Sequence, residues 1–205
     1  YLYEMIWAFE RLWNEDKEIN WGKILRFCGR LIKDANFWKE ERNDGKKSWL
    51  TGAISSLIES GVQKDKRAFN EKYLPIARNV LIEIVREETD SSNDLLDPVT
   101  AALNSAKGKA LSSLLNYALR YARIKYKNKE NASLKKWEKE VEEVFTERLD
   151  KNIDKSLEVH TILGQYLPQF SYLDKNWIKE HLKGIFPKDE RNEKYWEAAF
   201  GGYLF

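Results

Sequence analysis

The spacing of apolar residues is the feature that most constrains this 205-residue chain. Apolar side chains recur at intervals of three and four residues, the period that places them on one face of an α-helix. The first four series are Ile24, Phe27, Cys28, Leu31, Ile32, Ala35; Leu50, Ala53, Ile54, Leu57, Ile58; Tyr73, Ile76, Ala77, Val80, Leu81, Ile84; and Leu111, Leu114, Leu115, Ala118, Leu119, Ala122. Later series are Val141, Val144, Phe145, Leu149; Ile153, Leu157, Leu163, Leu167; and Trp177, Ile178, Leu182, Ile185. No stretch alternates apolar and polar residues as a half-buried strand does, so the sequence predicts an all-α fold.

Short polar segments and prolines separate these series, which gives eight or nine helices of roughly 10–20 residues joined by short loops. Pairs of helices recur at a spacing of about 40 residues, near the period of HEAT-like units, although no repeated consensus is present. We therefore predict stacked antiparallel pairs, a HEAT-like or TPR-like α-solenoid, with an irregular helical bundle as the alternative. Residues 1–205 are taken as a single domain, with 87–96 as a candidate sub-boundary.

The charge balance argues against a general polyanion binder. Lys and Arg number 35 and Asp and Glu 33, a net charge of +2, whereas nucleic-acid-binding domains gather a basic excess on one face. No apolar run approaches the roughly 18 residues of a membrane span, so we expect no membrane partner. The single cysteine, Cys28, falls in an apolar series and reads as a buried thiol in a reducing, cytoplasmic compartment.

The sequence DPVTAALNSAKGKALSSLL at 97–115 contains Gly108-Lys109 and raises the question of a phosphate-binding loop. The P-loop motif GxxxxGK[ST] requires a glycine where Leu103 stands and a hydroxyl residue where Ala110 stands. The motif is therefore not present.

A corner between two helices accounts for more of these residues. Asp97 is a suitable N-cap for a short helix with Pro98 at its first position. Ser105 then caps the long helix that follows, and Gly108 marks a close approach of the two helices. Lys107 and Lys109 lie near a helix N-terminus and are candidate anion contacts, although a solvated face is the more ordinary interpretation.

The densest basic segment defines the second candidate site, with Arg120, Arg123, Lys125, Lys127 and Lys129 interleaved with Tyr117, Tyr121 and Tyr126. Cations between aromatic rings suit single-stranded nucleic acid. The tyrosines border an apolar series, however, and cations are also favoured at the C-terminal end of a helix by its dipole. Nucleic-acid binding through residues 120–129 is therefore the alternative function.

Catalytic and metal sites have little support. His160 and His181, the only histidines, lack the HExxH spacing of a zinc helix. The carboxylates at 138–143 interleave with lysines, as on a solvated helix face. We expect no catalytic residue, no cofactor and no metal. The eight tryptophans are expected to be mostly core residues, with one or two exposed ones acting in binding.

Two segments resemble helical regions of large bacterial antiphage defence proteins, both STAND-type NTPases and SIR2-linked proteins. They are DPVTAALNSAKGKALSSLLNYALRYA and EVHTILGQYLPQFSYLDKNWIKEHLKGIFP, the second followed by YWEAAFGGYLF. The matching positions are Asn104, Gly108, Leu115, Tyr117, Gly164, Leu173, Asp174, Trp177, Phe186, Trp196, Tyr203 and Leu204. The resemblance covers 97–205 and contains no catalytic motif.

The resemblance implies a non-catalytic recognition or scaffold segment that binds a protein, such as a phage protein, and biases self-association of a larger parent. The chain starts at Tyr1 without methionine and has apolar ends, so we expect a piece of a longer protein whose enzymatic domains lie elsewhere. Residue chemistry alone gives only the weaker expectation that a free surface of stacked helices binds a protein.

Overall fold

The computed structural model describes residues 1–39, 46–88, 97–127 and 135–205. Within these ranges it contains twelve α-helices, three 3-10 turns and no strand, so the all-α prediction is confirmed. The α-helices are α1 (Leu2–Asn14), α2 (Trp21–Lys33), α3 (Ala35–Lys39), α4 (Lys46–Val62), α5 (Leu74–Glu87), α6 (Pro98–Asn104), α7 (Ala106–Lys125), α8 (Lys139–Leu149), α9 (Leu157–Gln165), α10 (Leu167–Leu173), α11 (Lys175–Ile185) and α12 (Glu193–Leu204). The turns are η1 (Asp65–Arg67), η2 (Glu71–Tyr73) and η3 (Glu190–Asn192).

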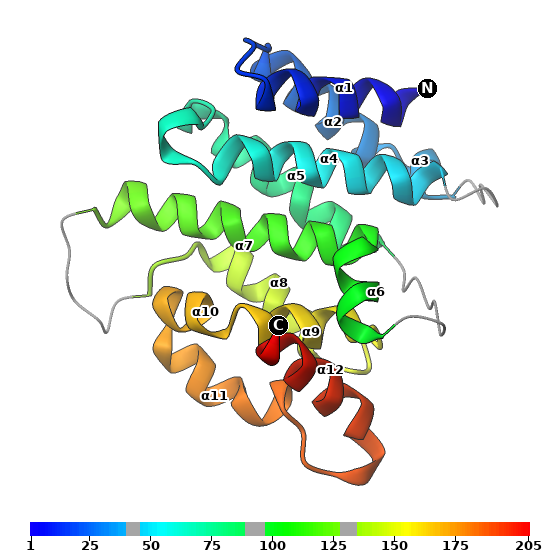
Figure 1. Cartoon of the computed structure of the whole chain (residues 1–205), viewed down its shortest axis with the longest axis vertical. Coiled ribbons are helices and arrows are strands. Elements are labelled where there is room, and N and C mark those ends of the chain that lie inside the picture. The colour runs from blue at the N-terminus through cyan, green and yellow to red at the C-terminus, as the bar shows by residue number, and fades with distance from the viewer. Residues whose placement is uncertain (40–45, 89–96, 128–134) are drawn as a thin grey trace.

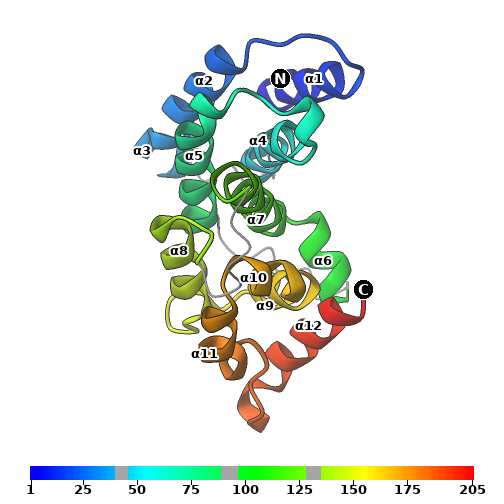
Figure 2. The ribbon, with the colours of Figure 1, turned by 90° about the vertical axis from the view of Figure 1, so that its left-hand side faces the viewer.

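The first helices stand in two columns. The front column of Figure 1 contains α1, α4 and α7, and each of these helices packs on the next. The second column contains α2, α5 and α8, with α2 packed on α5 and α5 on α8. Figure 2 shows the columns side by side, with α11 below α8. The outer side of the second column is therefore a surface to which α2, α5 and α8 contribute.

Helix α7 is the centre of the core. It contacts α4, α5, α6, α9 and α10, and its apolar series is buried except for the half-buried Leu119. One cluster of buried apolar side chains extends from Ile6 in α1 to Ala199 in α12. Although α7 is 20 residues long, neither it nor any other described helix combines the length and apolarity that crossing a membrane requires.

The last third of the chain departs from the column order. Helix α12 returns to pack along α9, and α6 also packs on both of these helices. The arrangement supports stacked helices, while a regular α-solenoid stays a prediction. The candidate sub-boundary at 87–96 lies almost wholly outside the described residues.

The number of helices differs from the predicted eight or nine because three of the twelve are short. Helices α3, α6 and α10 have five to seven residues each. The predicted series from Ile153 to Leu167 was wrong as a single helix: Ile153 is 53% exposed in a turn before α9. The predicted helix is also interrupted at Tyr166, between α9 and α10. Pro168 lies in the first turn of α10 and disfavours a continuous helix through this point.

Candidate functional site: a cationic groove between α2 and α5

Helix α2 carries all its charge on one side. The Asn20 side chain accepts a hydrogen bond of 3.0 Å from the Lys23 backbone N–H and begins the helix. Lys23, Arg26, Arg30 and Lys33 then follow at spacings that place them within an arc of about 80°. The helix contains no acidic residue. Because the opposite face is apolar and packs on α5, the four cations point outward and are exposed.

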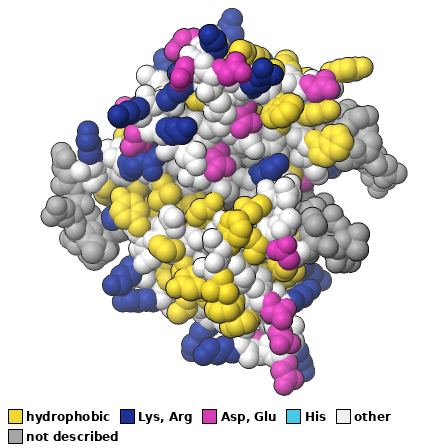
Figure 3. All heavy atoms as spheres, in the orientation of Figure 1, with side chains coloured by type: hydrophobic (Ala, Val, Ile, Leu, Met, Phe, Trp, Pro, Cys, Tyr) yellow, Lys and Arg dark blue, Asp and Glu magenta, His cyan; other side chains and the backbone are white. Residues whose placement is uncertain are grey.

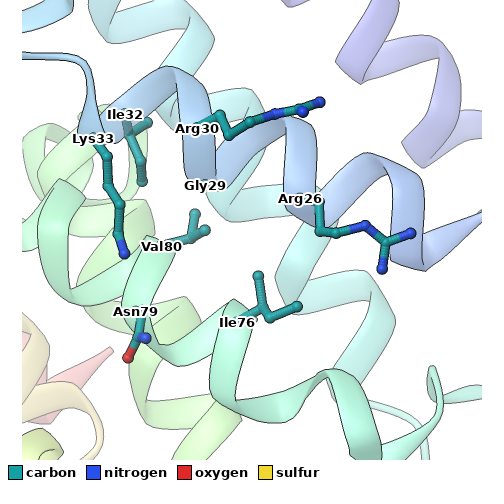
Figure 4. Close-up of a pocket in the computed structure, with 8 residues that line it drawn as sticks. All are labelled: Arg26, Gly29, Arg30, Ile32, Lys33, Ile76, Asn79 and Val80. Carbon is teal, nitrogen blue, oxygen red and sulfur yellow. The ribbon is translucent and has the colours of Figure 1, made fainter.

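The groove lies where this basic side meets α5. It has a volume of about 280 Å³ and is lined by Arg26, Gly29, Arg30, Ile32, Lys33, Ile76, Asn79 and Val80. Figure 4 shows Gly29, Ile76 and Val80 in the middle, with Arg26 on one side and Lys33 with Asn79 on the other. The groove therefore combines an apolar floor with a rim of positive charge.

Three cations of α2 have no charged partner among the residues that the structure describes. In the described residues Arg26, Arg30 and Lys33 make no ion pair and no side-chain hydrogen bond. The neighbouring α5–α8 contact is the opposite case. The Arg78 guanidinium lies 2.7 Å from the Glu138 carboxylate, and the Arg86 guanidinium lies 3.0 Å from that of Glu147. Free positive charge in this column is thus concentrated at α2.

Three other hollows in the described part of the chain mix both signs of charge. One near the end of α11 is lined by Lys151, Lys183 and Lys188 but also by Asp189. A second, beside η3, places Asp189 and Glu190 next to Lys188. The α2–α5 groove differs from these hollows, because it has cations in its lining and no carboxylate. It is therefore the best candidate for binding an acidic ligand.

The predicted basic segment at the end of α7 is partly used inside the protein. Arg120 and Arg123 both contact the Asp65 carboxylate of η1, at 2.7 and 2.9 Å. Lys125 and Lys127 are exposed, and Lys129 lies outside the described residues. Tyr117 is buried in the core. The segment thus holds η1 against α7 and leaves two exposed cations rather than a continuous basic surface.

Lys107 does not lie on a solvated face. Its side chain is 5% exposed, and its ammonium lies 2.7 Å from the Asp154 carboxylate, whose side chain is 2% exposed. The ordinary expectation for a lysine in the first turn of a helix was wrong, because the turn before α9 covers this end of α7. Lys109 is half-buried, with its stem against Gly52 of α4.

The predicted corner at 97–108 is confirmed. Asp97 accepts hydrogen bonds from the backbone N–H groups of Val99 and Thr100, and Ser105 accepts one from that of Gly108. A Cβ at Gly108 would lie 1.8 Å from the Ala102 carbonyl oxygen, so only glycine permits this approach of α6 and α7. The glycine serves packing rather than phosphate binding.

The histidines and the cysteine are structural. His160 is 1% exposed, and its Nδ1 lies 3.0 Å from the Ile185 carbonyl oxygen. His181 stacks on Trp177 within α11. Burial raises the pKa of the Cys28 thiol to about 12, which leaves it protonated and unreactive at neutral pH. Among the described residues no three His, Cys, Asp or Glu side chains gather as metal ligands.

Two tryptophans, Trp7 and Trp49, are more than half exposed, at 69% and 58%. Four of the eight tryptophans, Trp13, Trp21, Trp137 and Trp177, are buried and Trp38 and Trp196 are partly buried, so fewer are core residues than the sequence predicted. Apolar side chains are also exposed at the end of α12, at Tyr203 and Phe205. Figure 3 shows hydrophobic side chains over the middle and lower part of the front face, where this end of the chain lies.

Sequence reasoning missed the α2 groove and a buried carboxylate. The basic spacing of α2 can be seen in the sequence, but the lack of internal partners for its cations cannot.

The buried carboxylate is Glu59 on α4. It receives hydrogen bonds from Ser112, Ser113 and Asn116 of α7, at 3.3, 3.2 and 2.7 Å. Burial raises the pKa of Glu59 in spite of these donors. Nothing in the local sequence distinguishes Glu59 from an exposed glutamate.

Comparison with known proteins adds no relative: no family model matches the chain, and no curated protein or solved structure is significantly similar to it.

Proposed function

We propose that the chain is a non-catalytic recognition scaffold that binds an acidic segment of another protein in the groove between α2 and α5. The observation that carries the proposal is the set of unpaired cations on α2, next to an α5–α8 contact whose charges are paired. Concentrated charge without an internal partner attracts a ligand of opposite sign. The lining groups are cations, an amide and aliphatic side chains, which suit binding rather than acid–base chemistry.

A protein ligand fits this groove better than a nucleic acid does. The floor is formed by Ile32, Ile76 and Val80, which favour an apolar side chain over a phosphate. The positive charge is also confined to one helix, whereas a nucleic acid is usually held by a basic surface that follows its backbone. Salt screening of the exposed cations should weaken binding as ionic strength rises.

The biological setting is a further part of the proposal. The resemblance of 97–205 to antiphage defence proteins suggests a sensor region in the bacterial cytoplasm, whose ligand is a phage protein. Ligand binding would then bias self-association of a larger parent through a difference in affinity between two states. The groove lies in α2 and α5, outside the segment that carries the resemblance, so the two arguments are independent.

The test uses the immobilised chain in nuclease-treated lysates of phage-infected and uninfected bacteria. The variant Arg26→Glu/Arg30→Glu reverses the charge of two side chains that have no partner in the described residues, so the fold should be preserved. Lys125→Glu/Lys127→Glu makes the same charge change at the end of α7 and is the matched control. Retained proteins are identified by mass spectrometry and then purified for direct binding.

The proposal predicts a protein that the wild type and the α7 control retain and that the α2 variant loses. Circular dichroism must show equal helicity in all three forms. Retention that is unchanged in Arg26→Glu/Arg30→Glu contradicts the proposal. Nucleic acid that the wild type retains from lysates without nuclease treatment, and that only the α7 variant loses, would instead support nucleic-acid binding through residues 120–129.

A further inference from the structure

Gly29 lies in the middle of the groove floor, and packing does not require a glycine there. A Cβ at this position would lie 3.7 Å from the Val80 Cγ2 and 3.9 Å from the Ile76 Cγ2, which are ordinary contacts. At Gly22, on the same helix, an added Cβ would lie 2.7 Å from the Tyr73 hydroxyl oxygen and would clash. Since glycine weakens a helix relative to alanine, Gly29 leaves space at a cost to the helix.

The groove is large enough to admit a side chain of a bound protein segment. Pockets that enclose drug-sized ligands have volumes of about 300–1,000 Å³, and the groove has about 280 Å³. Its floor at Ile32, Ile76 and Val80 is aliphatic. An aliphatic side chain inserted over Gly29 would pack on the partly exposed Ile76 and on the edges of Ile32 and Val80, which are almost fully buried.

The cations are placed on both sides of that space. Figure 4 shows Arg26 on one side of Gly29 and Lys33, with Asn79, on the other. Arg26 and Lys33 are seven positions apart, so their α-carbons are separated by about 10 Å along α2. Arg30 extends along the outer edge of the groove. A ligand centred on Gly29 can therefore meet positive charge at each end.

We infer that the groove selects acidic segments in which an aliphatic side chain, inserted over Gly29, is flanked on both sides by carboxylates. The carboxylates contact Arg26 and Lys33, and Asn79 supplies a neutral hydrogen-bonding group beside Lys33. This inference rests on the proposed function and adds the chemical identity of the ligand. Charge gives attraction and orientation, and the aliphatic anchor distinguishes the correct segment from other acidic sequences.

The test compares two fluorescein-labelled peptides by fluorescence anisotropy. The first has a leucine between two pairs of glutamates, and the second has serine in place of the leucine, so their charges are equal. Burial of one leucine side chain corresponds to about tenfold or more in affinity. The wild-type chain should bind the leucine peptide at least tenfold more tightly, and both affinities should fall as salt is added.

The variant Gly29→Leu fills the space without changing any charge. It should reduce the affinity for the leucine peptide to that of the serine peptide and leave the serine peptide unaffected. Gly184→Leu is the matched control, because no atom lies within 4 Å of a Cβ added at that position of α11. It should retain the preference for leucine. Thermal unfolding of each variant verifies that both are folded.

Equal affinity of the wild type for the two peptides overturns the inference, as does a leucine preference that Gly29→Leu leaves intact. A labelled single-stranded oligonucleotide that binds more tightly than either peptide also overturns it, in favour of a phosphate polyanion. The inference fails alone if Arg26→Glu/Arg30→Glu abolishes acidic-peptide binding but leucine gives no advantage. The inference and the proposed function both fail if Arg26→Glu/Arg30→Glu leaves the binding of both peptides and of every lysate protein unchanged.

Discussion

The Lys107 ammonium lies 2.7 Å from the Asp154 carboxylate, and this ion pair joins the start of α7 to the turn before α9 in an almost fully buried position. Arg148 approaches the same carboxylate at 3.7 Å. Burial opposes ionisation of Asp154, but hydrogen bonding and the charge of Lys107 outweigh it and lower the pKa of the carboxyl group. The pair therefore links the central helix to the C-terminal helices.

Removing one partner of this ion pair should be far more damaging than removing both. Lys107→Met leaves a buried carboxylate whose remaining cation is the more distant Arg148, at 3.7 Å, and we expect a loss of about 3 kcal/mol in the free energy of unfolding. Lys107→Met/Asp154→Leu removes both charges and should recover most of that loss. Urea denaturation at pH 7 measures both values. A loss below about 1 kcal/mol in the single variant would show that the pair is not buried as described.

His160 should make the protein sensitive to acid. Burial lowers its pKa from 6.5 to about 4, with the Lys151 charge acting in the same direction and the contact with the Ile185 carbonyl and the Asp154 charge opposing it. Below pH 6.5 the unfolded chain binds a proton that the folded chain does not. The contribution of neutral His160 to the free energy of unfolding is therefore fully present above pH 6.5. It is lost as the pH falls towards 4, and the total loss is about 3 kcal/mol.

The His160→Gln variant isolates this effect. The difference in unfolding free energy between wild type and variant should shrink as the pH falls from 6.5 to 4, because only the wild type has the imidazole. Urea denaturation across this range gives the slope. Parallel pH profiles would mean that His160 is not the responsible group.

Glu59 should behave in the opposite way. Burial raises its pKa, while Ser113 and Ser112 lower it by hydrogen bonding and the nearby Glu10 raises it further. The folded chain therefore holds a proton that the unfolded chain releases just above pH 4.5, and the group's contribution to stability falls as pH rises. Glu59→Gln keeps the shape without the charge, so it should raise the Tm at pH 7 and lose that advantage near pH 4.5. An unchanged Tm at pH 7 would contradict this account.

The crossing of α9 and α12 should tolerate no added methyl group. A Cβ at Gly164 would lie 1.9 Å from the Ala199 carbonyl oxygen, and one at Gly202 would lie 2.2 Å from that of Thr161. Gly164→Ala should cost more than about 3 kcal/mol, since the clash is with backbone. Gly184→Ala, in open space on α11, should instead stabilise by up to about 1 kcal/mol. Calorimetric Tm values compare the two, and equal effects would contradict the close crossing.

The sequence could predict features whose causes are local. Asp97 and Ser105 cap helices within three residues of themselves, so their roles were readable. The break at Tyr166 was marked by Pro168, although the apolar spacing concealed it. Features that depend on distant residues were not readable: Arg120 meets Asp65 across 55 positions, and Lys107 meets Asp154 only in the folded protein.

The candidate site illustrates the same limit. The spacing of Lys23, Arg26, Arg30 and Lys33 is that of a basic helix face, which was not among the sites predicted from the sequence. A basic face becomes a candidate site only when its charges have no internal partner, and that depends on where α5 and α8 place their carboxylates. Because Arg78 and Arg86 pair with the Glu138 and Glu147 carboxylates on the α8 side, and no carboxylate lines the groove, the cations of α2 remain available.

The most direct test of the central claim is a charge exchange between the groove and its ligand. Binding of the glutamate–leucine peptide, and of the same peptide with lysines in place of the glutamates, is measured by anisotropy. The account predicts that the wild type and Lys125→Glu/Lys127→Glu bind only the glutamate peptide, whereas Arg26→Glu/Arg30→Glu rejects it and binds the lysine peptide. Undiminished binding of the glutamate peptide by Arg26→Glu/Arg30→Glu would contradict the account.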